Sequence, residues 1–290
     1  MIVHQQAQPE ELDLLRRHGL DTVDGAFAFA GGRELEKPGL GTRRRVRLEL
    51  TDAGFRAVTW YLKCYGPIPW PVRLWRLLTG RGKTRPALRE YLNVNALRDA
   101  GVPTMRAIIC GAQSAWLGDA RSYIVVTGVP GEALERCMGR FLDEFGDDAV
   151  RMAEFNAALV ELAARLHAAG HVHRDLYASH IFLDAEGGRV QLYLIDLARV
   201  FAPRWRKSRW RVKDLAQFKY SMPAAWVAAH WDGFLAAYVR RLAVGAVLAG
   251  ADPAAAPAAT ALPTCLSPAI DRKVAQMRRR AARRTRHAGP

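Results

Sequence analysis

Apolar side chains in the middle of the chain recur with the period of a helix. Between Asp147 and Gly170 they follow one another at spacings of three and four residues: Met152, Phe155, Leu159, Leu162 and Leu166. This spacing puts them on one face of an amphipathic helix. Asp147 or Asp148 can cap its first turn, and Gly170 can end it. The pattern is helical again from Val212 to Gly250.

The first half of the chain has the pattern of strands instead. Arg43 to Leu50 and Arg56 to Tyr65 are rich in alternating, β-branched and aromatic residues, and Thr51 to Gly54 between them suits a hairpin turn. A helix is predicted from Thr84 to Ala100, with Thr84 as its cap and Leu88, Tyr91 and Leu92 on one face. Further strands are predicted at Met105–Cys110, Tyr123–Thr127, Ile181–Asp184 and Val190–Asp196. The pattern indicates a strand-rich first lobe and a helical second lobe.

Charge is distributed unevenly along the 290 residues, which are 50% hydrophobic and carry a formal net charge of +15. Three segments, Gly66–Arg89, Pro203–Lys219 and Arg272–Pro290, together carry +20, so the rest of the chain carries −5. A mildly acidic body with basic patches suggests a polyanionic partner: nucleic acid, an anionic membrane surface or a phosphorylated substrate. A small acidic protein is a further candidate partner.

The cysteines and the apolar runs indicate in which cellular compartment the chain works. No C-x-x-C pair occurs among Cys64, Cys110, Cys137 and Cys265, which argues against a zinc site and a disulfide framework. Met1 to Leu20 has no apolar signal region, and the apolar run Leu242–Ala251 is too short to span a bilayer. We expect a cytoplasmic chain, with Ala251–Pro268 as a linker and the basic tail after Arg272 disordered.

The polar loop after the central helix carries the candidate chemistry. It contains His171-Val172-His173-Arg174-Asp175, and Asp196 ends the strand that follows the next hairpin. Two carboxylates at loop and strand boundaries can hold a divalent cation beside a substrate hydroxyl. Upstream, Lys63 lies inside an apolar strand, where a lysine is costly without a partner. Glu90, 27 residues later in the predicted helix, is a candidate for that partner.

This set of residues, in this order and context, resembles the protein-kinase-like fold. The segments HAAGHVHRDLYASHIFLD, LYLIDLARV and RWRVKDLAQFKYS resemble more closely the lipopolysaccharide core kinases of the Kdo/WaaP group. The resemblance implies an α+β, two-lobed kinase fold, with a β-rich N-lobe at 1–127, a helical C-lobe at 128–250, and a linker and basic tail at 251–290. It also implies ATP-dependent phosphorylation of a heptose or Kdo of the lipopolysaccharide inner core, with Mg²⁺, by an enzyme peripheral to the inner membrane.

The resemblance further implies a role for each site residue. Asp175 would accept the proton of the attacking hydroxyl or orient it. Lys63 would contact the ATP phosphates and be positioned by Glu90, and Asp196 would hold Mg²⁺. His180 stands where typical protein kinases have Asn, and its imidazole can ligate a metal. The supports of the loop would be His173 and Arg174, and the candidate ligands of an anionic acceptor are Arg206, Arg209 and Arg211.

The sequence departs from protein kinases in several places. Asp196-Leu197-Ala198 replaces D-F-G, and the glycine-rich loop is poor, so the phosphate-covering loop is placed only around Lys37–Thr42. Tyr177 stands where protein Ser/Thr kinases carry Lys, which argues against a protein substrate. Pro67–Leu78 interleaves Trp with Arg and is either a solvated insert or an interfacial membrane segment.

Two alternatives remain from the sequence. One is a kinase of another glycan, a small molecule or a protein. The other is a non-catalytic pseudokinase that binds a polyanion through its basic patches. Nucleic acid is a distant alternative as partner. His167, next to the apolar stripe of the central helix, is expected to be structural.

Overall fold

The computed structural model describes residues 2–35, 43–51, 57–67, 86–115, 118–248 and 261–287, together with positions 54, 69–71, 74 and 78. The chain forms two compact units. The first comprises Met1–Arg98 and Met105–Val129, and the second comprises Asp99–Thr104 and Pro130–Pro290. Each is described below by itself.

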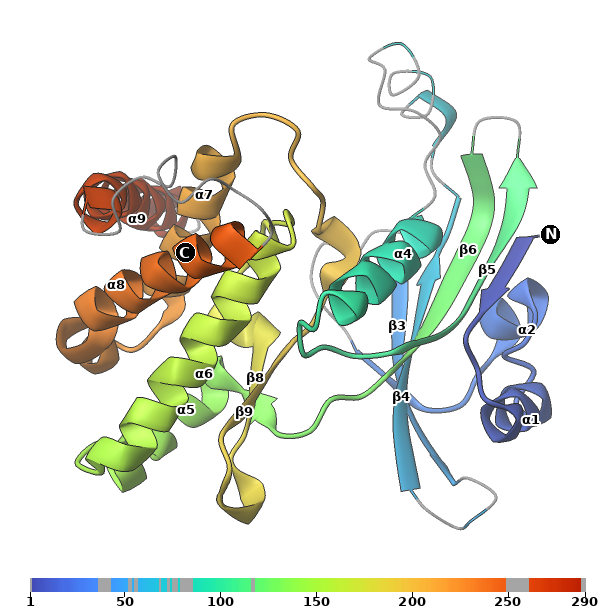
Figure 1. Ribbon diagram of the computed structural model, residues 1–290. Coiled ribbons are helices and arrows are strands. Elements are labelled where there is room, and N and C mark those ends of the chain that lie inside the picture. Colours follow the sequence, from blue (N-terminus) through green and yellow to red (C-terminus); the bar gives the residue numbers. More distant parts are fainter. Residues whose placement is uncertain are drawn as a thin grey trace. The chain divides into compact units, whose positions relative to one another are not determined.

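The first unit is built on a six-stranded antiparallel sheet in the order β1-β5-β6-β4-β3-β2 (Figure 1). Its strands are β1 (Ile2–Gln5), β2 (Arg33–Glu34), β3 (Arg43–Thr51), β4 (Ala57–Tyr65), β5 (Ala107–Ala115) and β6 (Gly118–Thr127). The predicted hairpin is present, since β3 pairs with β4 from Arg43↔Tyr65 to Thr51↔Ala57. The two later strands of this unit run beyond their predicted ends, because they pair with each other to the tip of their own hairpin.

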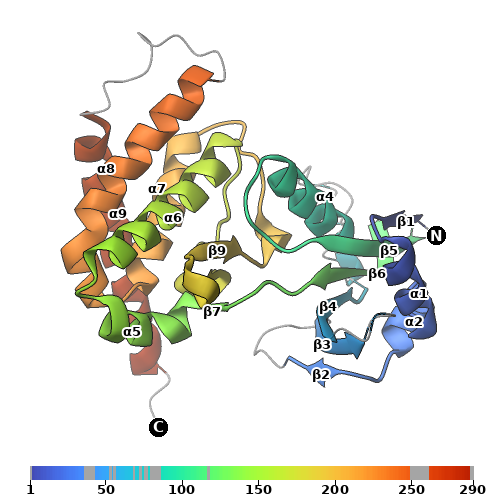
Figure 2. The same cartoon turned by 60° about the horizontal axis from the view of Figure 1, so that its bottom comes forward.

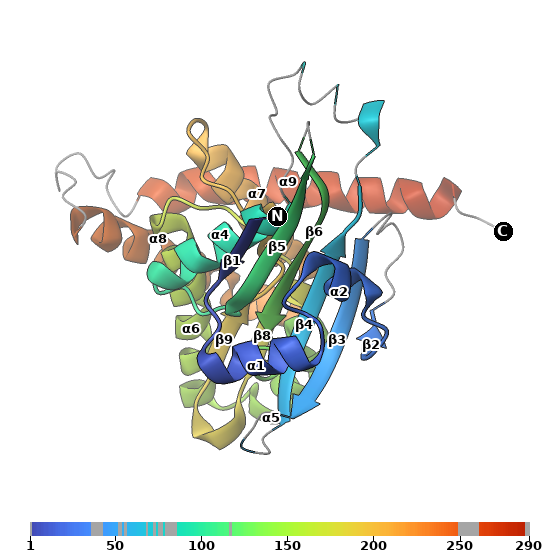
Figure 3. The ribbon, with the colours of Figure 1, turned by 90° about the vertical axis from the view of Figure 1, so that its right-hand side faces the viewer.

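Helices cover both faces of the sheet, as Figure 3 shows for α1 (Pro9–Arg17) and α2 (Val23–Ala28) on one side. Leu62 and Cys64 of β4 belong to the buried core on that side, and the Cys64 thiol lies 3.6 Å from the carbonyl of Ala26 in α2. Side chains alternate along a strand, so Lys63 points to the opposite face and meets α4 (Pro86–Asp99). Both faces of β4 are therefore buried.

The helix α4 corrects one detail of the sequence prediction. Its buried residues are Ala87, Glu90, Tyr91, Val94 and Leu97, whereas Leu92, predicted to share the apolar face, is 56% exposed. A face built on Tyr91, Val94 and Leu97 leaves position 92 almost half a turn away, on the side of the helix remote from the sheet. The predicted cap, Thr84, lies outside the described residues.

The second unit is mainly helical, with α5 (Leu134–Phe145), α6 (Ala149–Ala168), α7 (Lys207–Ser221), α8 (Ala224–Leu248) and α9 (Ala261–His287). A small antiparallel sheet, β7 (Glu132–Ala133), β8 (Ile181–Asp184) and β9 (Gln191–Leu194), lies near α5 (Figure 2). The whole predicted apolar stripe of α6 is buried. Asp148 caps this helix by accepting hydrogen bonds at 3.0 Å from the backbone N–H groups of Val150 and Arg151. The helical pattern after Val212 belongs to two helices, because Pro223 separates α7 from α8.

The basic tail is not disordered as predicted, because it forms most of α9. Ile270 and Val274, one turn apart, are buried, and Asp271 pairs with Lys219 of α7 at 2.6 Å. One apolar pair and one cross-helix ion pair anchor a segment that its charge alone would leave in water. The linker expected at 251–268 lies partly outside the described residues, and its last residues belong to α9.

No helix among the described residues is long and apolar enough to cross a membrane. Cys64, Cys110 and Cys137 are buried thiols, and burial raises the pKa of Cys64 to about 11.

Candidate active site

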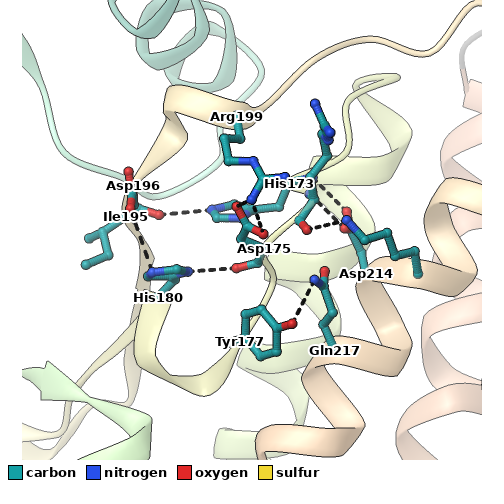
Figure 4. A network of polar contacts seen from close by, with 11 residues as sticks. His173, Asp175, Tyr177, His180, Ile195, Asp196, Arg199, Asp214 and Gln217 are labelled. Atoms are coloured by element: carbon teal, nitrogen blue, oxygen red, sulfur yellow. Dashed lines mark hydrogen bonds and ion pairs between the residues drawn. The ribbon is translucent and has the colours of Figure 1, made fainter. Parts of the chain in front are cut away.

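Asp175 lies in the loop that joins α6 to β8, in the second unit. Its carboxylate is partly exposed and accepts from Arg199, whose Nη1 lies 2.8 Å from Oδ2 and 3.0 Å from Oδ1 (Figure 4). Arg199 ends the short helix η3 (Leu197–Arg199), three residues after Asp196. The Asp175 side chain thus stands in a defined position with a cation beside it.

The loop is anchored from behind by Asp214 of α7, a fully buried carboxylate. It accepts from the backbone N–H groups of His173 at 2.6 Å and Arg174 at 2.8 Å (Figure 4). Arg174 has a φ of 72°, a left-handed conformation that costs energy for a side chain with a Cβ. Two charge-assisted hydrogen bonds offset that cost, so Asp214 fixes the backbone immediately before Asp175.

Side chains of α7 also surround Arg174. Lys213 donates from Nζ to the Arg174 carbonyl at 2.7 Å, and burial lowers the pKa of Lys213. The Arg174 guanidinium lies 5.5 Å from the ring of Phe201 and 5.6 Å from that of Trp210, within cation–π range. The residue expected to support the loop is therefore itself packed from two elements.

His173 joins the loop to the segment that carries Asp196. Its Nε2 lies 2.9 Å from the carbonyl of Ile195, which can only accept, so Nε2 carries the proton. Burial lowers the pKa of His173, which favours the neutral ring. Asp196 follows with a φ of 58°. The two carboxylate-bearing segments are therefore held against each other by a hydrogen bond from a buried imidazole.

His180 and Asp196 form a pair of donors suited to a cation. Nδ1 of His180 lies 2.7 Å from the carbonyl of Asp175 and must donate to it, which leaves the lone pair of a neutral ring on Nε2. Nε2 lies 3.8 Å from Oδ2 of Asp196 (Figure 4). No group of three His, Cys, Asp or Glu residues able to hold a metal occurs in the described part of the chain. Of this pair, the Asp196 carboxylate is the kind of oxygen ligand that Mg²⁺ takes in small number, with water and phosphate oxygens in the rest of its shell.

Lys63 and Glu90 belong to the first unit, where both are buried. The expected ion pair between β4 and α4 is present, from Lys63 Nζ to Glu90 Oε1. Tyr65 donates its hydroxyl to the other oxygen, Oε2, at 2.6 Å. Both oxygens of this carboxylate are therefore engaged, and Lys63 is fixed on the sheet.

The three candidate ligands of an anionic acceptor do not form one cluster. Arg206 and Arg209 are exposed at the start of α7. Arg211 donates to the carbonyl of His167 at 3.0 Å, close to the end of α6. His167 is structural as expected, because it is buried with Nδ1 2.7 Å from the Tyr238 hydroxyl and Nε2 3.3 Å from Asp214.

Some functional candidates lie outside the described residues or were not found from the sequence. The predicted phosphate-covering loop Lys37–Thr42 and half of Pro67–Leu78 are not described, although Trp70 is 68% exposed. Asp214 and Arg199 occur in the segments RWRVKDLAQFKYS and LYLIDLARV. These segments indicate the family but do not indicate a role for either residue. An acid alone among the bases of α7 was the one available signal for Asp214.

Comparison with known proteins identifies the family. The model of the lipopolysaccharide kinase (Kdo/WaaP) family matches residues 75–238. The lipopolysaccharide core heptose(I) kinase WaaP of Pseudomonas aeruginosa is 30% identical over 217 residues, which cover 70% of this chain and 75% of that protein. WaaP of Escherichia coli K12 is 28% identical over 200 residues, covering 65% and 69%.

A solved structure of WaaP in complex with acyl carrier protein has the same fold. It superposes with a TM-score of 0.64 at 21% identity, over 95% of this chain and 99% of that one. The expected α+β fold, with an antiparallel first unit and a helical second unit, is thereby confirmed. The chain belongs to the lipopolysaccharide kinase (Kdo/WaaP) family, as its motifs predict, and is a phosphotransferase.

Proposed function

We propose that this protein transfers the γ-phosphoryl group of ATP to a hydroxyl of a heptose in the lipopolysaccharide inner core. The main support is Asp175, a partly exposed carboxylate on a loop that is held by hydrogen bonds of His173 to the buried Asp214 and to the carbonyl of Ile195. A carboxylate so fixed can orient a hydroxyl and accept its proton. Heptose is preferred to Kdo because the curated relatives are heptose(I) kinases.

Arg199 defines how the acceptor meets Asp175. One Nη1 group contacts both carboxylate oxygens, so the incoming hydroxyl has to share or replace that contact. The Arg199 side chain is 54% exposed, and an ion pair this exposed contributes little stability. The acceptor can therefore displace it at small cost, while Asp214 keeps the loop backbone in place.

Each unit holds candidate nucleotide ligands of its own. Lys63, held by Glu90 and Tyr65, contacts the phosphates of ATP. The two donors for Mg²⁺ are Asp196 and His180. Mg²⁺, when bound, neutralises charge on the phosphates and favours their transfer. Phosphoryl transfer needs little beyond such positioning and electrostatic stabilisation.

The basic segments bear on where in the cell the enzyme works and on a second binding partner. We propose that it works at the cytoplasmic face of the inner membrane, where anionic lipids attract basic surfaces. A small acidic protein is also proposed as a partner, because the WaaP of the solved structure is in complex with acyl carrier protein. The phosphorylated acceptor and the anionic surface account for the charge without nucleic acid.

The direct test is phosphoryl transfer by purified protein from ATP, with Mg²⁺, to a lipid-linked core acceptor. Asp175→Asn should abolish transfer while leaving Mg-ATP binding intact. Asp143→Asn, the same change at an exposed position of α5, should be as active as the unaltered protein. Equal turnover by Asp175→Asn would refute the role of Asp175.

The acceptor is tested by comparison. Core saccharides ending in heptose or in Kdo, unrelated glycans and a generic protein substrate are offered in parallel. Preference for Kdo or a protein would reject heptose as the acceptor. Failure to bind Mg-ATP at all would favour the pseudokinase alternative.

A further inference from the structure

A groove of about 570 Å³ lies between the first turns of α7 and the middle of α9, within the second unit. Five of its lining side chains are basic, and Trp210 is its aromatic member: Arg209, Lys213, Arg272, Lys273 and Arg279. None of its lining residues is acidic. Figures 1 and 2 show the two helices side by side. Neither Asp175 nor Asp196 lines the groove.

The charge of the groove is not neutralised by its own helices. The only acids in the sequence of α7 and α9 are Asp214 and Asp271. Asp214 accepts from the backbone of the catalytic loop, and Asp271 pairs with Lys219. Exposed bases continue from the groove along α9: Arg278, Arg280 and Arg283. Bases gathered in this way, with no acid among the described residues that line the groove, attract an anion from solution.

The shape and chemistry of the groove suit a phosphate headgroup. Its volume is that of a small-ligand pocket. Arginine binds phosphate through two parallel hydrogen bonds, and the groove offers three arginines. Trp205, directly before α7, is 84% exposed, and tryptophan is typical of the headgroup level of a bilayer.

The orientation of α9 favours binding at a surface rather than insertion. Its apolar residues Ile270 and Val274 are buried against the protein, so the exposed side is basic. From Arg272 to Arg283 the exposed charged side chains of α9 are all basic, so this part of the helix would contact a membrane through charge. An acidic protein could meet the same bases, but the exposed Trp205 and the pocket-sized groove favour a lipid.

We propose that the groove between α7 and α9 binds the phosphate groups of anionic phospholipid headgroups and holds the kinase at the bilayer surface. The inference rests on the proposed function, because a lipid-linked acceptor requires the enzyme to work at a bilayer surface. It names the surface that would meet the lipid. Lys213 belongs to this groove and also bonds the Arg174 carbonyl, so the bound headgroup would lie next to the catalytic loop.

The test is sedimentation with vesicles of phosphatidylcholine alone and of phosphatidylcholine mixed with phosphatidylglycerol. The full chain should bind only the anionic vesicles, and less as salt is raised. The triple variant Arg272→Glu/Lys273→Glu/Arg279→Glu should lose about 100-fold in partitioning, given the effect of each base near such a surface. The matched control is Arg17→Glu/Arg33→Glu/Arg240→Glu, with an equal change of net charge at exposed sites elsewhere. It should lose less than about 10-fold.

Three outcomes would overturn the proposal. One is equal loss in both triple variants, since the effect would then follow net charge alone. Another is an unchanged affinity for anionic vesicles together with lost binding of an acidic protein such as acyl carrier protein. The third is binding of inorganic phosphate to the protein with no binding to phosphatidylglycerol vesicles above that to phosphatidylcholine vesicles, which would assign the groove to free phosphate. Circular dichroism checks that each variant is folded. If the triple variant with glutamate does not fold, Arg272→Gln/Lys273→Gln/Arg279→Gln is used in its place.

Vesicle binding is measured without ATP or acceptor. A failure of phosphoryl transfer would therefore contradict the proposed function and leave the vesicle result unaffected. A failure to bind anionic vesicles would contradict the role of the groove and leave the proposed function unaffected.

Discussion

The replacement Asp214→Asn tests whether the catalytic loop depends on one buried charge. The carboxylate accepts from the N–H groups of His173 and Arg174 at 2.6 and 2.8 Å and is fully buried. Asparagine has the same shape but one acceptor oxygen, and its NH₂ would face one of the two N–H groups. One backbone donor would be left without a partner, and the other would bond to a neutral group.

The size of the effect follows from these two bonds. A hydrogen bond to a charged group contributes about 1.5–3 kcal/mol, and a buried donor without a partner costs about 1–3 kcal/mol. We expect Asp214→Asn to lower the free energy of unfolding of the second unit by about 3 kcal/mol. Since 1.4 kcal/mol is tenfold, the amides of His173 and Arg174 should exchange hydrogen about 100-fold faster.

Hydrogen exchange of the loop, urea unfolding and steady-state kinetics measure this prediction. The kcat should fall by a larger factor than KM for ATP rises, because Lys63 and Glu90, which belong to the first unit, keep their ion pair. Asp232→Asn, the same change at an exposed position of α8, is the control and should behave as the unaltered protein. If exchange at His173 and Arg174 stays unchanged in Asp214→Asn, the loop is held by something other than this carboxylate.

Three further changes test the packing and charge of the fold. Lys63→Met should lower the free energy of unfolding in urea by about 3 kcal/mol, because it leaves the buried Glu90 carboxylate without its cation. Adding Glu90→Gln should restore at least half of that loss. A double variant as unstable as the single one would contradict this. The hydrogen bond from Arg241 holds the pKa of Glu161 below its ordinary value of 4.5. Its stabilisation is therefore complete above pH 4.5 and lost as the pH falls through the folded-state pKa, so Glu161→Gln should cost about 1 kcal/mol or less at neutral pH, after screening by solvent, and nothing in strong acid. Ile270→Ala should cost about 2–4 kcal/mol and speed tryptic cleavage within α9, because Ile270 is fully buried; unchanged cleavage would mean that α9 does not depend on this contact.

Elements with a strong local signal were predictable from the sequence, and those that depend on a distant partner were not. The stripe, the cap and the terminal Gly170 of α6 agree on one helix, and all three are present. The tail was expected to be disordered because its charge dominates its composition. Its helix depends on Ile270, Val274 and an ion pair with Lys219, a partner about fifty residues away. Periodicity over two apolar residues is too weak a signal to outweigh eight bases.

The same distinction separates the parts of the candidate site. The pairing of Lys63 with Glu90 could be inferred, because a lysine in a buried strand requires an acid and few acids are near enough in the sequence. The role of Asp214 could not, because its partners are backbone N–H groups, which every residue has and no motif marks. The contact of Arg199 with Asp175 is exposed and therefore weak, and composition gives no sign of it.

The two missed contacts differ in strength, and that difference bears on how the site works. Behind Asp175, the bonds to Asp214 and Ile195 involve the fully buried side chains of Asp214 and His173, so breaking them leaves polar groups without partners. In front, the ion pair with Arg199 is more than half exposed on the arginine side, and water can replace either partner. An incoming hydroxyl therefore competes with a contact worth about 1 kcal/mol or less, whereas displacing the loop would cost several times as much. The acceptor can reach the carboxylate without disturbing the backbone that positions it.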